Sequence, residues 1–500
     1  MDNEQLGTHL LQAGLVRKDQ LEAARAEQRI TGEKLGNILV RDGFLSRQNL
    51  VEILLELDPA SLHAESHFTA RIPPEVLLET QTMVVTETDS AFYIASLQPE
   101  SVVLGRLESY REGRALHFMP VDVEKLDGYL AFLDELVNGE QAALDKLLHR
   151  AFNEGISDIH IVPRYSTYSV FFRRLGVRHL AHEGDLEEYN SLTARIKDLS
   201  KMDLAERRVP QDGGFQLEHN GRLVDLRVAT TPVNNSEYVV IRLLDPDNAK
   251  PSLSGLGITR VKEWRKGTSR PDGLNLICGP TGSGKTTTLN ASIREADRFG
   301  SAIFTLEDPV EYRIPYVGQV NVNPAVGLDY ARGIRAFMRS DPDIIVVGEI
   351  RDQETARNAI KSAETGHMVL GTLHTESIFG AVQRLRDLDV PAYELVYLLR
   401  SILVQRLLRT TCPRCKAAGC PHCHGTGYAG RTIVSECAYF SQESEVQRLV
   451  KGERWWPSML DDAVGKYRAG VTTRAEVQRV FGEEASVLLG EEAGDAHGPV

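Results

Sequence analysis

The chain has 500 residues, which is enough for about three domains that each bury a hydrophobic core. Hydrophobic residues make up 42% of it and charged residues 25%, close to the averages of globular proteins, so a fibrous repeat or a wholly disordered chain is excluded. With a net charge of −13 the chain would repel a polyphosphate backbone, and we expect no nucleic-acid partner.

The N-terminus begins without the basic and apolar stretches of a secretion signal, and no apolar run approaches the ~18 residues that span a bilayer. These features predict a cytoplasmic protein. An internal repeat follows at once, because Leu6-Gly7 and Gly14 recur 29 positions later as Leu35-Gly36 and Gly43. The apolar spacing predicts helices, and the single glycines fit their C-terminal ends. We therefore expect two copies of a small helical unit.

Two further regions precede the main core. Residues 61–137 mix β-rich runs with helical ones and predict a small α/β subdomain. A helix with an apolar face from Leu144 to Ala151 then leads into the alternating strand Ser157 to Ile161, and β-rich segments continue to Val239 to Arg242. This pattern predicts a second domain. The segment Asp245-Pro246-Asp247 is typical of a hinge after it.

From Leu274 onward buried strands alternate with helical stretches, which predicts a parallel sheet covered by helices. The expected strands are Leu274 to Ile277, Ala302 to Leu306, Ile344 to Val347 and Met368 to Leu373. A P-loop, G-P-T-G-S-G-K-T, stands between the first strand and a helix-like segment. Its backbone N–H groups would cradle the β-phosphate of ATP, Lys285 would reach the β/γ-oxygens, and Thr286 would hold Mg²⁺. The residues expected to bind nucleotide are Gly279, Pro280, Thr281, Gly282, Ser283, Gly284, Lys285, Thr286 and Thr287.

Acidic residues and one histidine follow the neighbouring strands, at the edge where open α/β sheets bind ligands. Glu349 is the best candidate to polarise the attacking water or to complete the Mg²⁺ shell. Glu307 and Glu311 are further carboxylates at the same edge, although acidic residues at strand ends are often merely solvated. His374 is placed either to donate a hydrogen bond to the γ-phosphate or to serve a structural role.

Four cysteines form two CxxC pairs separated by four residues, dense enough to enclose one structural Zn²⁺. Disulfides are disfavoured in a reducing compartment, and His422 and His424 are substitute ligands. Cys278 and Cys437 stand alone and are expected to be inert. The expected zinc ligands are Cys412, Cys415, Cys420 and Cys423.

Together these motifs resemble those of the GspE/PilB-like hexameric ATPases of type II secretion and type IV pilus assembly. The resemblance rests on the P-loop, the acidic box Thr305 to Tyr312, the stretch Asp341 to Asp352 and the histidine box Thr365 to Thr375. It implies an α/β fold with a RecA-like P-loop ATPase domain, a PAS-like α/β N-terminal domain, a helical MshEN-like N-terminal module and a small zinc knuckle. It also implies four phosphate-sensing arginines, for which the alternative is ordinary surface ion pairs. They are Arg227, Arg242, Arg335 and Arg339.

This resemblance divides the chain into seven parts. They are the MshEN-like repeat (1–60), the α/β subdomain (61–137), the PAS-like domain (140–248), the RecA-like domain (252–410), the zinc module (411–437), a helical region (438–490) and a disordered tail (491–500).

The function that the resemblance implies is a Mg²⁺-dependent, ATP-hydrolysing homohexamer that powers type II secretion or type IV pilus assembly. It would be peripheral to the inner membrane and bound to platform and anchor proteins there. Two alternatives stay open. A nucleic-acid-translocating motor is disfavoured by the charge and by the lack of a basic-aromatic stretch. A non-hydrolysing scaffold that responds to a cyclic dinucleotide is disfavoured because Lys285, Thr286 and Glu349 are retained.

The chain also departs from the family pattern. Gln5 and Lys34 replace arginines of a module that binds cyclic di-GMP, and neither can both stack on guanine and fork to phosphate as arginine does. A structural docking role for the repeat is therefore favoured over retained binding. Val162 and Leu175 replace acidic residues of the second domain, so its interface should differ in detail. Glu376 replaces an asparagine and leaves the hydrolytic groups in place.

Overall fold

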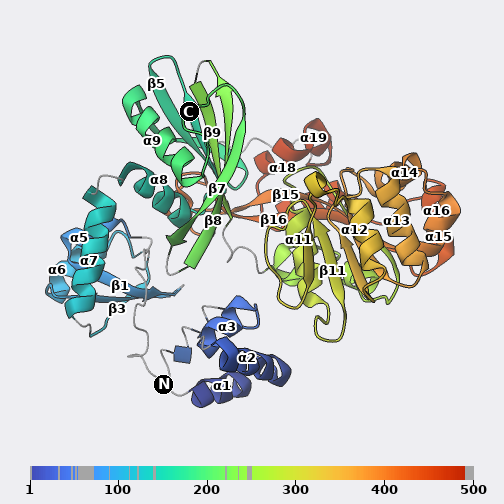
Figure 1. Cartoon of the computed structure of the whole chain (residues 1–500), viewed down its shortest axis with the longest axis horizontal. Helices are drawn as coiled ribbons and strands as arrows, with labels where there is room; N and C mark the ends of the chain where they lie inside the picture. Colours follow the sequence, from blue (N-terminus) through green and yellow to red (C-terminus); the bar gives the residue numbers. More distant parts are fainter. Residues whose placement is uncertain are drawn as a thin grey trace. The chain divides into compact units, whose positions relative to one another are not determined.

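The computed structural model describes residues 3–31, 34–46, 49–50, 53–54, 72–88, 90–111, 113–120, 123–138, 142–219, 222–234, 236–244 and 251–489. The chain forms two compact units, Met1–Asp245 and Pro246–Val500, each of which is described by itself (Figure 1). The expected hinge at Asp245-Pro246-Asp247 and the expected tail at 491–500 lie outside the described residues. No helix in the described ranges is long and apolar enough to cross a membrane.

The N-terminal repeat is helical and has its own apolar core. Its helices with described bounds are α1 (Asn3–Gln12), α2 (Lys18–Thr31) and α3 (Leu35–Arg41). A Cβ on Gly7 would lie 3.3 Å from the Leu21 side chain, and a Cβ on Gly36 would lie 2.9 Å from that of Leu50. Because Leu21 and Leu50 are equivalent in the two copies, the glycine of each copy packs closely against the corresponding leucine.

A small three-stranded sheet follows, with β1 antiparallel and β3 parallel to the central strand β2. Its core comprises apolar side chains of the strands and of the three helices. The elements are α5 (Pro74–Glu79), β1 (Thr82–Glu87), β2 (Ala91–Ser96), α6 (Glu100–Leu107), β3 (Ala115–Phe118) and α7 (Val123–Asn138).

The next sheet has six antiparallel strands in the order β6-β5-β4-β9-β8-β7. Alternate residues of its strands pack with helices α8 and α9 in one apolar cluster, so these helices cover one face and leave the other open. The elements are α8 (Ala142–Asn153), β4 (Asp158–Pro163), β5 (Thr167–Arg174), β6 (Val177–Asp185), α9 (Leu186–Leu199), β7 (Gln211–His219), β8 (Arg222–Val233) and β9 (Ser236–Leu244).

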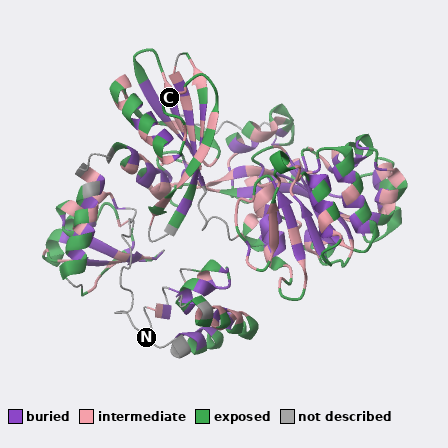
Figure 2. Cartoon of the chain, in the orientation of Figure 1, coloured by how far each residue is buried: buried purple, intermediate pink, exposed green. Residues whose placement is uncertain are grey.

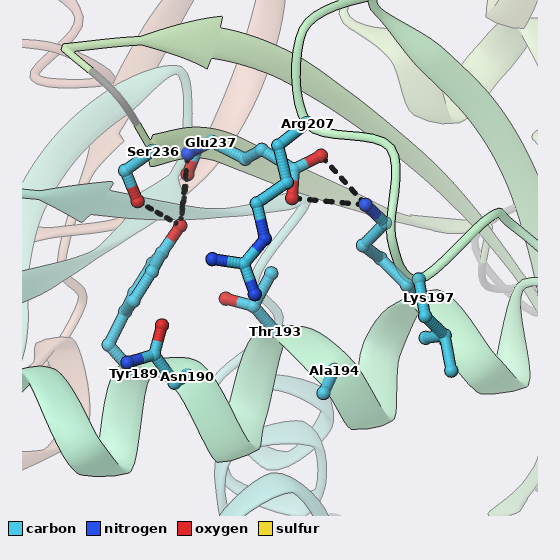
Figure 3. Close-up of a pocket in the computed structure, with 9 residues that line it drawn as sticks. Tyr189, Asn190, Thr193, Ala194, Lys197, Arg207, Ser236 and Glu237 are labelled. Atoms are coloured by element: carbon cyan, nitrogen blue, oxygen red, sulfur yellow. Dashed lines mark hydrogen bonds and ion pairs between the residues drawn. The ribbon is translucent and has the colours of Figure 1, made fainter.

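A buried ion pair joins α9 to β9 in this domain (Figure 3). Lys197 Nζ lies 3.0 Å from both carboxylate oxygens of Glu237 and donates to the Glu206 carbonyl at 2.7 Å, while Tyr189 Oη donates to the Glu237 carbonyl at 2.6 Å. The pocket lined by Tyr189, Lys197, Glu237 and Arg207 holds about 20 Å³, which is room for one water and not for a small molecule. The Lys197–Glu237 pair therefore has a structural role, which is to join α9 to β9.

The unit Pro246–Val500 is built on a seven-stranded sheet in the order β12-β11-β13-β14-β10-β15-β16. All neighbours are parallel except β15 and β16. One apolar cluster joins the strands to α12, α13 and α14, and another joins them to α10 and α11, so helices cover both faces. Figure 2 shows the central strands buried between these helices. This layering places the carboxyl ends of six strands along one edge.

The strands of this sheet are β10 (Gly273–Cys278), β11 (Ile303–Glu307), β12 (Gly318–Asn321), β13 (Ile344–Val347), β14 (Met368–Leu373), β15 (Leu399–Thr411) and β16 (Tyr428–Tyr439). The helices on its faces are α10 (Val261–Thr268), α11 (Lys285–Glu295), α12 (Tyr330–Phe337), α13 (Gln353–Glu364), α14 (Ile378–Asp387) and α15 (Ala392–Leu398). The C-terminal helices are α16 (Glu443–Val450), α17 (Met459–Arg468), α18 (Arg474–Phe481) and α19 (Glu483–Leu489).

One expected division differs from the structure. Residues 428–437 were assigned to the zinc module, but they belong to β16, which pairs along its length with β15 in the main sheet. The four cysteines lie in the connection between these two strands. The strand β16 is buried without a break from Thr432 to Ala438, which makes it part of the sheet core and not of the cysteine segment.

The Lys197–Glu237 pair generates a stability prediction. Replacing Lys197 by Met leaves the Glu237 carboxylate buried without its partner, which typically costs 3–5 kcal/mol. We expect amide hydrogen exchange in β9 to accelerate accordingly, as followed by mass spectrometry. The matched control is Lys146→Met, which changes an exposed lysine of α8. Equal exchange rates in the two variants would contradict a stabilising role for the Lys197–Glu237 pair.

Candidate active site at the carboxyl edge of the sheet

The P-loop connects β10 to α11, in the place that the sequence predicts. Gly284 has φ 87° where the loop enters the helix, a conformation that favours glycine. Lys285 Nζ is half-buried and donates to the carbonyls of Gly279 at 2.9 Å and Pro280 at 3.2 Å. Burial lowers the pKa of Lys285, and the charge of Glu349 opposes this shift. The two groups therefore interact across the site.

The loop has polar groups that suit a phosphate and a divalent cation. Ser283 Oγ is buried and has no hydrogen-bond partner in the described part of the chain, so it needs one from outside. The Thr286 hydroxyl, in the first turn of α11, makes no hydrogen bond with the described residues. An oxygen-ligated cation such as Mg²⁺ fits that position, and phosphate oxygens fit the helix N-terminus.

Glu349 follows β13 and contacts an arginine and a histidine. Its Oε2 lies 2.7 Å from Arg351 Nη2, and its Oε1 lies 3.1 Å from Nε2 of His374, which follows β14. Burial would raise the pKa of Glu349, but the hydrogen bond from Arg351 and the charges of His374, Arg351 and Lys285 outweigh it and hold the pKa below its usual range. Glu349 is therefore a carboxylate at neutral pH.

Sequence reasoning missed Arg351. It stands in the stretch on which the resemblance rests but was given no role. Its position two residues after Glu349 in the same loop is the signal that identifies it, because a guanidinium so near a partly buried carboxylate is its natural partner.

Glu307 and Glu311 occupy different environments from Glu349. Glu307 ends β11 and is buried, where its Oε1 accepts hydrogen bonds from Thr305 Oγ1 at 2.7 Å and Gln319 Nε2 at 3.1 Å. Burial raises the pKa of Glu307 even against these hydrogen bonds. Glu311 is half-buried in the loop after β11. Glu307 is thus hydrogen-bonded to the neutral side chains of Thr305 and Gln319, while Glu349 contacts Arg351 and His374.

Two of the four expected arginines belong to this unit. Arg335 on α12 forms an ion pair with Glu354 in the first turn of α13. Arg339 lies exposed just after α12. Neither is bonded to Glu349 or to the P-loop in this structure, so their expected phosphate contacts stay a prediction.

The other two belong to the six-stranded sheet, in the unit Met1–Asp245. Arg227 on β8 and Arg242 on β9 are paired in register, and Arg242 Nε donates to Asp158 Oδ1 at 2.9 Å. Arg173 continues the row, because Asp158 on β4 pairs with both Arg242 and Arg173. Directly paired residues share a face, and the neighbouring positions Ile159 and Ile241 belong to the core under the helices. The arginine row therefore lies on the open face of the sheet.

The four cysteines converge as the sequence predicts. Their Sγ atoms all lie within 4.8 Å of one another, and three of the pairs are 3.7–3.8 Å apart. Four sulfurs bound to one Zn²⁺ at ~2.3 Å in tetrahedral geometry stand about 3.8 Å apart, so the cluster fits zinc. Burial opposes ionisation of Cys423, but N–H groups of Cys420 and Gly427 outweigh it and lower the pKa of its thiol to about 7. The remaining thiols, Cys278 and Cys437, are fully buried.

Comparison with known proteins agrees with this geometry. Residues 139–480 match the family model described as Type II/IV secretion system protein. The chain is 35% identical over 486 residues to the Type II secretion system ATPase E of Vibrio cholerae, covering 87% of this chain and 95% of that protein. It is 40% identical over 377 residues to a Type II secretion system protein E of Pseudomonas aeruginosa, covering 68% of this chain and 75% of that protein. The fold is similar to that of the Legionella pneumophila ATPase DotB, with a TM-score of 0.55 and 21% identity over 68% of this chain and 95% of that one.

The cysteine cluster generates a metal prediction. Protein purified under reducing conditions without chelator should contain about one zinc per chain by elemental analysis, and Cys415→Ser should lose it, because three thiolates bind more weakly than four. Cys437→Ala, which changes a buried thiol on β16 outside the cluster, should keep the metal. Wild-type protein without zinc would refute the assignment.

Proposed function

The chain belongs to the Type II/IV secretion system protein family, and from this membership we propose that it is the ATPase that powers a type II secretion or type IV pilus assembly machine. The reaction is hydrolysis of ATP, a phosphoryl transfer to water. The observation that carries the proposal is the Glu349 carboxylate, which is charged, held by His374 and Arg351, and coupled to the P-loop lysine. A P-loop alone would support nucleotide binding; a carboxylate beside it supports hydrolysis.

Each group at the carboxyl edge then has a role. Lys285 would exchange its present bonds to loop carbonyls for the β- and γ-phosphate oxygens. Glu349 would orient and polarise the attacking water. His374 would hold the Glu349 carboxylate and donate a hydrogen bond to the γ-phosphate when that group is present. The Thr286 hydroxyl would hold Mg²⁺, which neutralises charge on the phosphate oxygens when bound. Glu307 and Glu311 would shape the acidic border of the same site.

Arginines would complete the site in an oligomer. Arg335, on α12, and Arg339, just after it, would act on phosphate from within the same unit once Arg335 leaves Glu354. Arg227 and Arg242 lie on an open sheet face and would reach the phosphate of a neighbouring subunit. We propose a homohexamer on these grounds, with hydrolysis dependent on assembly. An arginine supplied by a neighbour stabilises charge that develops on the transferring phosphoryl group.

The wider setting follows from the family. The protein would act at the cytoplasmic side of the inner membrane, bound to platform and anchor proteins of the machine. The zinc cluster would fix the connection between β15 and β16. The N-terminal repeat would be a docking module, supported by glycines that serve helix packing; cyclic di-GMP is the alternative ligand for it.

Two substitutions separate binding from chemistry. Lys285→Ala should abolish nucleotide-dependent activity because it removes the phosphate contact. Glu349→Gln should keep ADP binding and lower the hydrolysis rate at least about a hundredfold, because the amide cannot take a proton from water. Steady-state phosphate release and calorimetry measure the two effects. The control is Glu364→Gln, which changes an exposed glutamate at the end of α13. Wild-type turnover by Glu349→Gln would remove that residue from the mechanism.

Subunit mixing tests the composite site. Specific ATPase activity should rise with protein concentration, and Arg227→Ala subunits mixed with Glu349→Gln subunits should regain part of the turnover, because some interfaces then combine an intact arginine with an intact carboxylate. Mixing Arg227→Ala with Arg242→Ala should give no rescue, since every interface lacks one arginine. Activity that is independent of concentration, with no rescue in the first mixture, would show that the arginines act within their own domain.

A further inference from the structure

A buried polar residue on the strand beside the P-loop stands out from its surroundings. Gln405 is fully buried on β15, where it follows the buried apolar residues Leu403 and Val404. The last paired residues of β10 and β15 are Cys278 and Val404, so Gln405 lies immediately beyond the end of β10, where the P-loop begins. Burying an amide among apolar side chains is costly unless both of its ends are hydrogen-bonded.

Both ends of the Gln405 amide are bonded to the P-loop and its helix. Nε2 donates to the Ser283 carbonyl at 2.8 Å, and Oε1 accepts from Thr288 Oγ1 on α11 at 2.8 Å. The Ser283 carbonyl can only accept a hydrogen bond, and the Thr288 hydroxyl donates its proton to Oε1. The Gln405 amide therefore has one favourable orientation, with Nε2 toward Ser283 and Oε1 toward Thr288. Thr288 is itself fully buried, which leaves the three groups no exchange with solvent.

This contact determines where the loop points its backbone. In a planar trans peptide the C=O and N–H groups point in opposite directions. The Ser283 carbonyl is turned to Gln405, so the N–H of Gly284, in the same peptide unit, is turned away from β15. That N–H has no partner among the described residues. The hydrogen bond from Gln405 to the Ser283 carbonyl thus directs the Gly284 N–H toward the side of the loop that would face a phosphate.

The glycines of the loop show how closely it lies on β15. A Cβ on Gly279 would come within 2.4 Å of the backbone carbonyl oxygen of Gln405, and a Cβ on Gly284 within 3.2 Å of the side-chain Nε2 of Gln405. Gly279 also has φ 145°. The loop therefore lies so close to Gln405 that a side chain at Gly279 would require it or its neighbours to move.

We propose that Gln405 is a positioning residue for nucleotide binding, whose amide holds the Ser283–Gly284 peptide with its N–H directed at the phosphate. This inference rests on the proposed function, because it names what shapes the phosphate cradle. Gln405 touches no substrate; it acts through the loop.

The test compares ADP affinity with stability. Gln405→Met keeps the volume and length of the side chain and removes both hydrogen bonds. Calorimetric titration with ADP and Mg²⁺ should show at least about tenfold weaker binding, because the cradle loses one fixed donor. Thermal unfolding without nucleotide is measured in parallel. Ser401→Ala is the matched control, since Ser401 is a buried polar residue of the same strand that bonds Asn275 and not the P-loop.

Thr288→Val is the second variant and covers the case in which Gln405→Met does not fold. It removes the hydroxyl that orients the amide and should weaken ADP binding about threefold or more. Unchanged ADP affinity in a folded Gln405→Met or Thr288→Val protein would overturn the inference, as would an equal loss of affinity in Ser401→Ala. If the wild-type protein itself does not bind ADP, the proposed function fails instead.

Discussion

The candidate active site depends on one electrostatic arrangement, the Glu349 carboxylate held between Arg351 and His374. These three residues come from the loops after β13 and β14, and Lys285 is the first residue of α11, which follows the loop after β10. Strand order brings them together, because β13 and β14 are neighbours and β14 lies next to β10. The parallel sheet is therefore the condition for the chemistry. In it, groups 64 residues or more apart in the chain, such as Lys285 and Glu349, share one edge and act on each other's charge.

Much of this edge could be predicted from the sequence. The P-loop and the apolar strands Leu274 to Ile277 and Ile344 to Val347 carry strong local signals, since a strand that is buried on both faces is continuously apolar. The residue that follows such a strand must then lie at the edge. That reasoning identified Glu349 and His374. The cysteine cluster could also be predicted from the sequence, because two CxxC pairs at this spacing bring their four sulfurs together.

Other features could not be predicted because they depend on contacts between distant segments. The ion pair of Arg242 with Asp158 joins β9 to β4, and the pairing of β15 with β16 makes the cysteine segment a connection between two strands of the main sheet. Gln405 is the sharpest case. In the sequence it is one polar residue in an apolar strand, and only the register of β15 on β10 places its amide under the P-loop.

Lys285 and Glu349 should act on the same nucleotide. A structure of the protein with Mg²⁺ and a non-hydrolysable ATP analogue would show whether they do. We expect Lys285 Nζ to leave the carbonyls of Gly279 and Pro280 for the β- and γ-phosphate oxygens, with the Glu349 carboxylate facing the γ-phosphate across one water. A nucleotide bound away from the P-loop, or a γ-phosphate that Glu349 does not face, would contradict it.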